Sequence, residues 1–129
     1  MRDPKDWKKP SRYFETLGMR LADSDEDSAT VELTFSEAFG NRKGDVHGGV
    51  IAGLIDISMS EAIRTTLSGF KGLSTISMSI NYLDVARGDL TGIGRVTRKG
   101  RTTAFASAEV RDRAGHLVAS GQGSFRIIR

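Results

Sequence analysis

The stretch HGGVIAGLIDISMSEAIRTTL, residues 47–67, decides the fold of this chain. Its apolar residues leave almost no polar face before Ser60, Glu61 and Arg64. A helix that is apolar nearly all round is buried, so the stretch predicts a central helix, roughly 30 Å long at 1.5 Å per residue. We expect Ser68 and Gly69 to end it.

Alternating segments on both sides of this helix predict strands. Residues 29–36 alternate apolar and polar side chains, with a turn expected at residues 23–27 and residues 19–22 as the other arm of a hairpin. Glycine-containing turns join four later segments into a predicted antiparallel meander: Thr75–Tyr82, Asp89–Thr97, Thr102–Val110 and Leu117–Ile128. Gly121 and Gly123 should let the last strand bend or pack closely. The prediction is an α+β fold, a curved sheet wrapped around one helix.

The 129 residues suffice for one domain with a real core. We expect residues 1–18 to form an arm or short helix and residues 19–129 to form the domain. The absence of a long apolar run excludes a membrane span, the polar N-terminus is not a signal peptide, and the cytoplasm is the expected location. Without cysteine the chain has no thiolate nucleophile or ligand, and His47 and His116 lie too far apart in sequence to suggest a metal site.

Basic residues concentrate in the C-terminal third of the chain. Residues 85–129 contain nine bases and three acids, although the net charge of the whole chain is only +3. This excess fits a solvated strand face, or a site for a phosphorylated small molecule. Nucleic acid is not an expected partner, because the region offers only Phe105 and Phe125 for stacking and no helix that could read bases.

Asp56 is the only ionisable residue between Gly48 and Ser60. A carboxylate in an apolar helix must be paired with another group, have a shifted pKa or take part in function. A polar contact with a neighbouring strand, or a helix turned so that Asp56 meets solvent, would also explain its presence. His47-Gly48-Gly49 opens the same helix, where free N–H groups could stabilise an oxyanion. The glycines could equally serve close packing, and His47 could simply cap the helix.

Spacing limits how these two features can cooperate. Gly48 and Asp56 are eight residues apart, about 12 Å on a straight helix, whereas a base must lie within a few ångströms of the carbonyl that it serves. One helix therefore cannot supply both groups to one carbonyl. Two antiparallel helices related by a twofold axis can supply both groups, each giving its N-terminus to one site and its Asp56 to the other. If the two features act on one carbonyl, the protein is therefore expected to be a homodimer with two composite sites.

The pattern Asn41, His47-Gly48-Gly49, Asp56, followed by TISMSINY from Thr75, resembles the hotdog-fold acyl-CoA thioesterases, most of all their phenylacetate-pathway branch. The resemblance begins near Met19 and implies a hotdog fold that dimerises through a continuous sheet and can pair into tetramers. It implies an acyl-CoA substrate, no separate cofactor and no metal.

The resemblance also assigns roles. Asp56 matches the catalytic carboxylate, a base or a nucleophile, and the Gly48 N–H matches the oxyanion donor. His47 and Asn41 would orient the thioester or water, and Thr75 would hold the water, with Ser74 as the alternative if the strand register differs. The basic residues at strand turns are candidates for the phosphates of coenzyme A: Arg98, Lys99 and Arg101, with Arg87 behind them.

Two other functions remain open on the same fold. Hotdog acyl dehydratases and hydratases also pair a histidine with a carboxylate but carry proline-containing motifs, and the only prolines here are Pro4 and Pro10. A non-catalytic acyl-CoA-binding protein is the other alternative.

Overall fold

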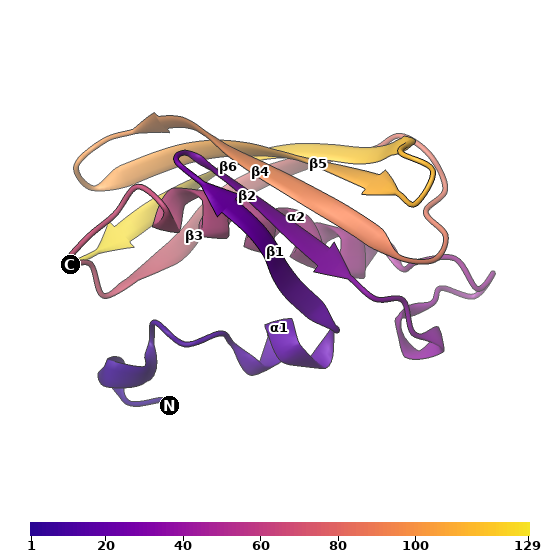
Figure 1. Ribbon diagram of the computed structural model, residues 1–129, viewed down its shortest axis with the longest axis horizontal. Helices are drawn as coiled ribbons and strands as arrows, with labels where there is room; N and C mark the ends of the chain where they lie inside the picture. The colour runs from indigo at the N-terminus through magenta and orange to yellow at the C-terminus, as the bar shows by residue number, and fades with distance from the viewer.

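The computed structural model describes residues 1–129 as a six-stranded antiparallel sheet wrapped around one long helix (Figure 1). The α+β prediction is therefore confirmed. The helical elements are η1 (Pro4–Asp6), α1 (Arg12–Thr16), η2 (Glu37–Phe39) and α2 (Gly48–Arg64). The strands are β1 (Met19–Asp25), β2 (Ser28–Leu33), β3 (Gly72–Tyr82), β4 (Leu90–Lys99), β5 (Thr103–Asp112) and β6 (Leu117–Ile128). No helix has the length and apolar character needed to cross a membrane.

Helix α2 forms the centre of the core. Its buried residues face the concave side of the sheet, and they are Val50, Ile51, Leu54, Ile55, Ser58, Met59, Ala62 and Ile63. The helix ends at Arg64, three residues before the predicted end at Leu67. The reason is that Thr65 and Thr66 donate their backbone N–H and hydroxyl groups to carbonyls three residues earlier, which tightens the last turn.

The strand order β1-β2-β4-β5-β6-β3 corrects the predicted four-strand meander. Only β4, β5 and β6 form a meander, whereas β3 pairs with β6 at the far edge of the sheet. The link between β3 and β4 spans residues 83–89, which is long enough to cross from this edge to the place between β2 and β5. The alternation of apolar and polar residues in β3 predicts which side chains face the core, but it does not predict which strand β3 pairs with.

The predicted hairpin is present, with a shorter turn. Asp23 and Asp25 belong to β1, and the turn consists of Glu26 and Asp27, the latter with a positive φ of 69°. Aspartate tolerates this left-handed conformation better than most residues, so a two-residue turn suffices.

Glycines let the sheet approach α2 closely. A Cβ added to Gly121 would lie 2.9 Å from Ile55 Cγ2, and one on Gly94 would lie 2.0 Å from the Ser58 carbonyl oxygen. The close packing predicted for the last strand is therefore confirmed, and Gly94 lets β4 approach the helix closely in the same way. Both contacts fix the height of the middle of α2 above the sheet.

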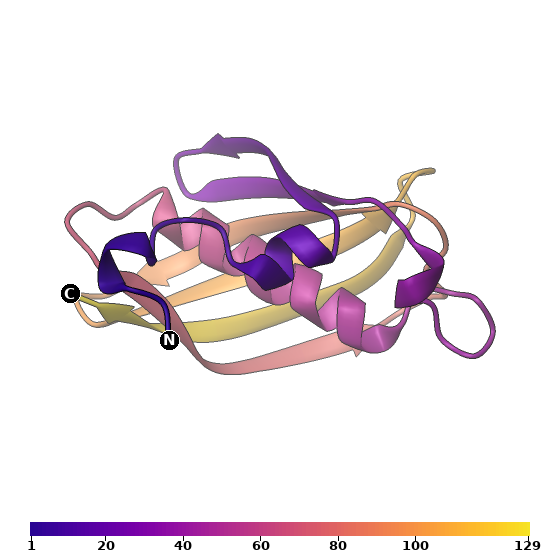
Figure 2. The ribbon, with the colours of Figure 1, turned by 90° about the horizontal axis from the view of Figure 1, so that it is seen from below.

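Residues 1–18 lie across the side of α2 that faces away from the sheet (Figure 2). Tyr13 packs its hydroxyl against Gly53, where a Cβ would lie 2.3 Å from it. Phe14 packs against the core, and Leu17 is buried in it. The arm thus crosses the half-buried face of α2, which carries the charged residues of the helix, Asp56, Glu61 and Arg64.

Candidate active site

Asp56 lies in the middle of α2, and its carboxylate reaches β3. The Thr75 hydroxyl donates a hydrogen bond of 2.8 Å to Asp56 Oδ1, while Oδ2 accepts no hydrogen bond from the chain. Thr75 pairs with the buried Phe125 in β6 and so faces the helix. Ser74 is its neighbour on the strand and points to the opposite face, because side chains alternate along a strand. The register therefore favours Thr75 over Ser74.

Two opposing effects act on this carboxylate. Burial raises the pKa of Asp56 above its ordinary value, and the hydrogen bond from Thr75 lowers it. Desolvation is the larger effect, because α2 and the sheet remove water from the charged form. A carboxylate with a raised pKa is a stronger base than an ordinary aspartate.

The start of α2 presents a free donor. His47 caps the helix through Nδ1, which accepts a hydrogen bond of 2.9 Å from the Gly49 N–H. The Gly48 N–H makes no hydrogen bond within the chain. It is one of the first N–H groups of the helix, where the positive end of the dipole lies, and it can therefore donate to an anionic oxygen.

Tyr82 contacts Gly48 through the carbonyl oxygen of that residue, not through its N–H. Its hydroxyl donates a hydrogen bond of 2.8 Å to the Gly48 carbonyl oxygen, and its ring lies 3.4 Å from the position of a Gly48 Cβ. Sequence reasoning missed this residue. The alternation of β3 marked Tyr82 only as an apolar position, and nothing in the pattern placed it beneath the helix start.

The loop before α2 is braced by Asn41. Its side-chain oxygen accepts hydrogen bonds from the N–H groups of Lys43 and Asp45, at 2.9 and 3.1 Å. Asp45 in turn accepts a hydrogen bond of 2.9 Å from Arg87 Nε. Asn41 thus shapes the loop that leads to His47, and Arg87 is tied to the same loop.

The predicted site residues therefore form two groups in one chain. Asn41, His47 and Gly48 gather at the start of α2, and Asp56 with Thr75 lies two helical turns further on. The eight-residue separation corresponds to about 12 Å along the helix. A single chain does not bring the free donor and the carboxylate together.

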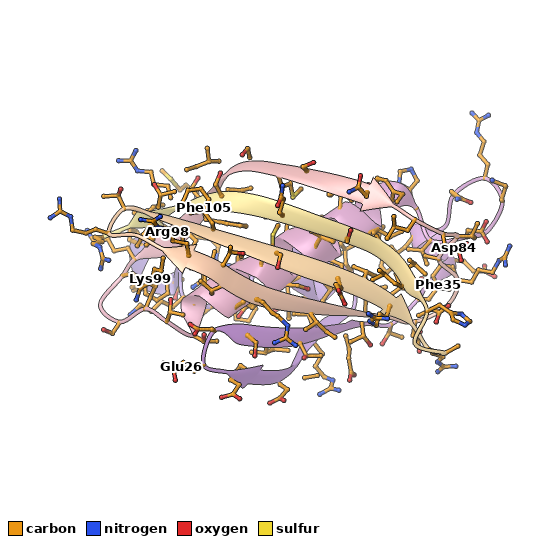
Figure 3. All side chains as sticks on the ribbon, turned by 90° about the horizontal axis from the view of Figure 1, so that it is seen from above. Glu26, Phe35, Asp84, Arg98, Lys99 and Phe105 are labelled. Carbon is orange, nitrogen blue, oxygen red and sulfur yellow. The ribbon has the colours of Figure 1, made fainter.

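The four predicted phosphate-binding residues are also divided. Arg98 and Lys99 lie near Phe105 at one end of the sheet, opposite the end that carries Asp84 (Figure 3). Lys99 Nζ donates to the Thr66 carbonyl oxygen beyond the end of α2, and Arg101 follows in the β4–β5 turn. Arg87 pairs with Asp45 at the start of α2, so one chain does not place all four cations at one site.

No group of three or more histidine, aspartate or glutamate side chains comes together in a way that could hold a metal ion. The chemistry available is that of a half-buried carboxylate, a hydroxyl donor and a free N–H at a helix end. These features on a sheet wrapped around a helix define a class of hotdog-fold proteins equipped to attack an activated carbonyl.

Comparison with known proteins agrees with this class. The model of the thioesterase superfamily matches residues 43–119, more than half of the chain. A protein of Saccharolobus solfataricus named as a candidate esterase is 33% identical over 95% of this chain and 88% of its own length. Human acyl-coenzyme A thioesterase 13 is 32% identical over 87% of this chain and 83% of its own length. The E. coli PaaI protein from the phenylacetic acid degradation operon shares the fold, with a TM-score of 0.84 at 22% identity over 92% of this chain and 86% of that one.

The chain belongs to the thioesterase superfamily, and it is a thioester hydrolase.

Proposed function

We propose that this protein hydrolyses a small aryl or medium-chain acyl-CoA to the free acid and coenzyme A. The observation that carries the proposal is the Asp56–Thr75 pair on a helix whose first N–H, at Gly48, is unpaired. The relative in humans is named an acyl-coenzyme A thioesterase, which supports the substrate class. Coenzyme A enters as part of the substrate, and no separate cofactor takes part.

The hydrolysis needs one water. Asp56 accepts a proton from the water, whose oxygen attacks the thioester carbon, and the carbonyl oxygen becomes an oxyanion held by the Gly48 N–H. When the carbonyl re-forms, the C–S bond breaks and the thiolate of coenzyme A receives the proton from Asp56. Direct attack by Asp56 as a nucleophile, followed by hydrolysis of the anhydride, is the second route. His47 and Asn41 orient the thioester or the water.

Asp56 and Gly48 serve one carbonyl only if they come from different chains. In a homodimer with antiparallel helices, each α2 places its start beside the Asp56 of the other chain, which gives two composite sites. The free edge of the sheet supports this arrangement. On β3, Ile76 and Met78 are 58% and 38% exposed, and no strand of the same chain covers that side. Exposed apolar edge strands pair readily with a second copy, and two such dimers could form a tetramer.

The basic residues complete the proposal. Arg98, Lys99 and Arg101 cluster at the β4–β5 turn and can attract the phosphates of coenzyme A, with Arg87 reaching a site from the other end of the helix. Their exposure means that each contributes modestly and loses strength as salt increases.

One assay separates the proposed activity from its alternatives. Acyl-CoA esters of increasing acyl size are mixed with the protein, and release of free thiol is followed together with the acyl product. A thioesterase releases one thiol per acid formed. A dehydratase or hydratase would change the acyl chain without releasing thiol, and a binding protein would bind the ester unchanged. Either of the last two results would overturn the proposal.

A further inference from the structure

A cavity of about 610 Å³ lies between the N-terminal arm and the C-terminal half of α2. Figure 2 shows the arm crossing this side of the helix, with the start of β3 beside it. The volume is within the roughly 300–1,000 Å³ range of small-molecule pockets. The arm residues that line it precede residue 43, where the match to the superfamily begins. The outer wall therefore lies outside the part of the chain that the superfamily model describes.

The cavity lies beside the Asp56–Thr75 pair, and it is lined by the chain neighbours of both residues, Ile57 on α2 and Ser74 on β3, rather than by the pair itself. Ser60 lines the cavity one helical turn beyond Asp56, on the same side of α2. Leu73 lines it two residues before Thr75 and so shares its face of β3. A thioester carbonyl held at Asp56 can therefore extend one of its two substituents directly into this space.

Apolar side chains form part of the wall, and the arm adds three solvent-exposed cations, Arg2, Lys8 and Lys9. Six apolar side chains from the arm, α2 and three strands line the cavity, and they are Trp7, Phe14, Leu21, Ile57, Leu73 and Ile128. The polar groups on α2 are partly engaged with their neighbours. Ser60 donates to the Ile57 carbonyl oxygen, and Arg64 lies 3.9 Å from the Glu61 carboxylate and 5.4 Å from the centre of the Phe70 ring.

We propose that this cavity is the acyl-binding chamber and that the N-terminal arm, through Trp7, forms the wall that limits the size of the acyl group. The proposal rests on the proposed function, since it concerns the same composite site. The occupant is an aryl or medium-chain acyl group. Coenzyme A itself, with its phosphates, stays outside the chamber.

Trp7 makes the chamber directly observable, because it is the only tryptophan in the chain. The probe is S-octyl-CoA, a thioether that has no carbonyl and cannot be hydrolysed. Titration into the intact protein should change the tryptophan emission saturably, while free coenzyme A at the same concentrations should not. No response to the thioether, or an equal response to free coenzyme A, would overturn the proposal.

Two substitutions change the chamber in opposite directions. Ser60→Phe fills it, and we expect about a tenfold loss of S-octyl-CoA affinity and of kcat/KM for octanoyl-CoA relative to acetyl-CoA, within the range that hydrophobic pockets achieve. Trp7→Ala enlarges it and should move the preference toward longer acyl groups. It should leave the fold intact, because Trp7 is only half-buried and its indole N–H donates within the arm, to the Arg2 carbonyl oxygen. Ser24→Phe is the matched control, since Ser24 is exposed on β1 and lines no cavity described for this chain.

The outcomes distinguish this proposal from the function on which it rests. If the protein binds S-octyl-CoA at Trp7 but hydrolyses no acyl-CoA, the chamber stands and the proposed hydrolysis fails. If it hydrolyses acyl-CoA but each chamber variant changes kcat/KM by the same factor for every acyl length, the hydrolysis stands and the chamber is refuted.

Discussion

Replacing Gly48 with proline removes one N–H group from the start of α2 and changes little else. Gly48 is the first residue of the helix, a position that proline favours because its N–H has no partner in the helix. His47, the preceding residue, has φ −61° and ψ 137°, the extended conformation that proline requires before it. A Cβ at residue 48 would meet the Tyr82 ring at 3.4 Å, an ordinary contact. We therefore expect Gly48→Pro to fold with a melting temperature close to that of the wild type.

The kcat of Gly48→Pro should fall sharply. Loss of one oxyanion donor typically lowers kcat by about 10²–10³-fold, and the Gly48 N–H is the proposed donor. Gly48→Ala is the matched control, because it adds the Cβ and keeps the N–H, so its kcat should stay within a few-fold of the wild type. Initial rates of thiol release at saturating acyl-CoA measure both. If the two variants lose activity equally while both are folded, the N–H does not stabilise the oxyanion and the reasoning is wrong.

Three further substitutions test other parts of the account. Asp56→Asn keeps an oxygen that can accept from Thr75 but removes the base, so kcat should fall by about 10²–10⁴-fold, and a normal turnover would exclude Asp56 as the base. Burial raises the native pKa of Asp56, so wild-type stability should fall as pH rises from the ordinary carboxyl pKa through the native one, because the native state then binds more protons than the unfolded state. Urea unfolding at several pH values should show a smaller fall in Asp56→Asn, and an unchanged fall would contradict the assignment. Thr75→Val removes the hydrogen bond that lowers the Asp56 pKa, so the acid limb of kcat/KM against pH should move to higher pH, whereas a shift to lower pH would refute the contact. Gly94→Ala places a Cβ 2.0 Å from the Ser58 carbonyl oxygen and should cost about 1–3 kcal/mol or more in the free energy of unfolding, and an unchanged value would show that β4 and α2 are not so close.

The central helix and the strands could be predicted from the sequence because their signals are local. The stretch from Val50 to Met59 has almost no polar face and so predicts a buried helix, and the alternation in β5 and β6 matches a sheet with one buried face. The position of β3 could not be predicted in this way. Its alternation is the same whether it pairs with β4 or with β6, and only the packing of the whole sheet around α2 distinguishes the two.

The site residues could be predicted to a similar extent. Asp56 stands out because a lone carboxylate in an apolar helix needs a partner, and the structure provides Thr75. Tyr82 could not be found, because an aromatic residue on a strand is ordinarily a core residue and its hydrogen bond to Gly48 joins positions 34 residues apart. The chamber beneath the arm was equally hidden, because the arm shows no periodicity that would place it against α2.

Subunit exchange tests the composite site most directly. Gly48→Pro dimers and Asp56→Asn dimers are each expected to be nearly inactive, and their mixture is allowed to exchange, with exchange verified by native mass spectrometry. Random exchange makes half of the dimers mixed, each with one intact site, so activity should return to about a quarter of the wild-type value. A mixture that exchanges fully and stays inactive would show that the Gly48 N–H of one chain and the Asp56 carboxylate of the other do not form a common site.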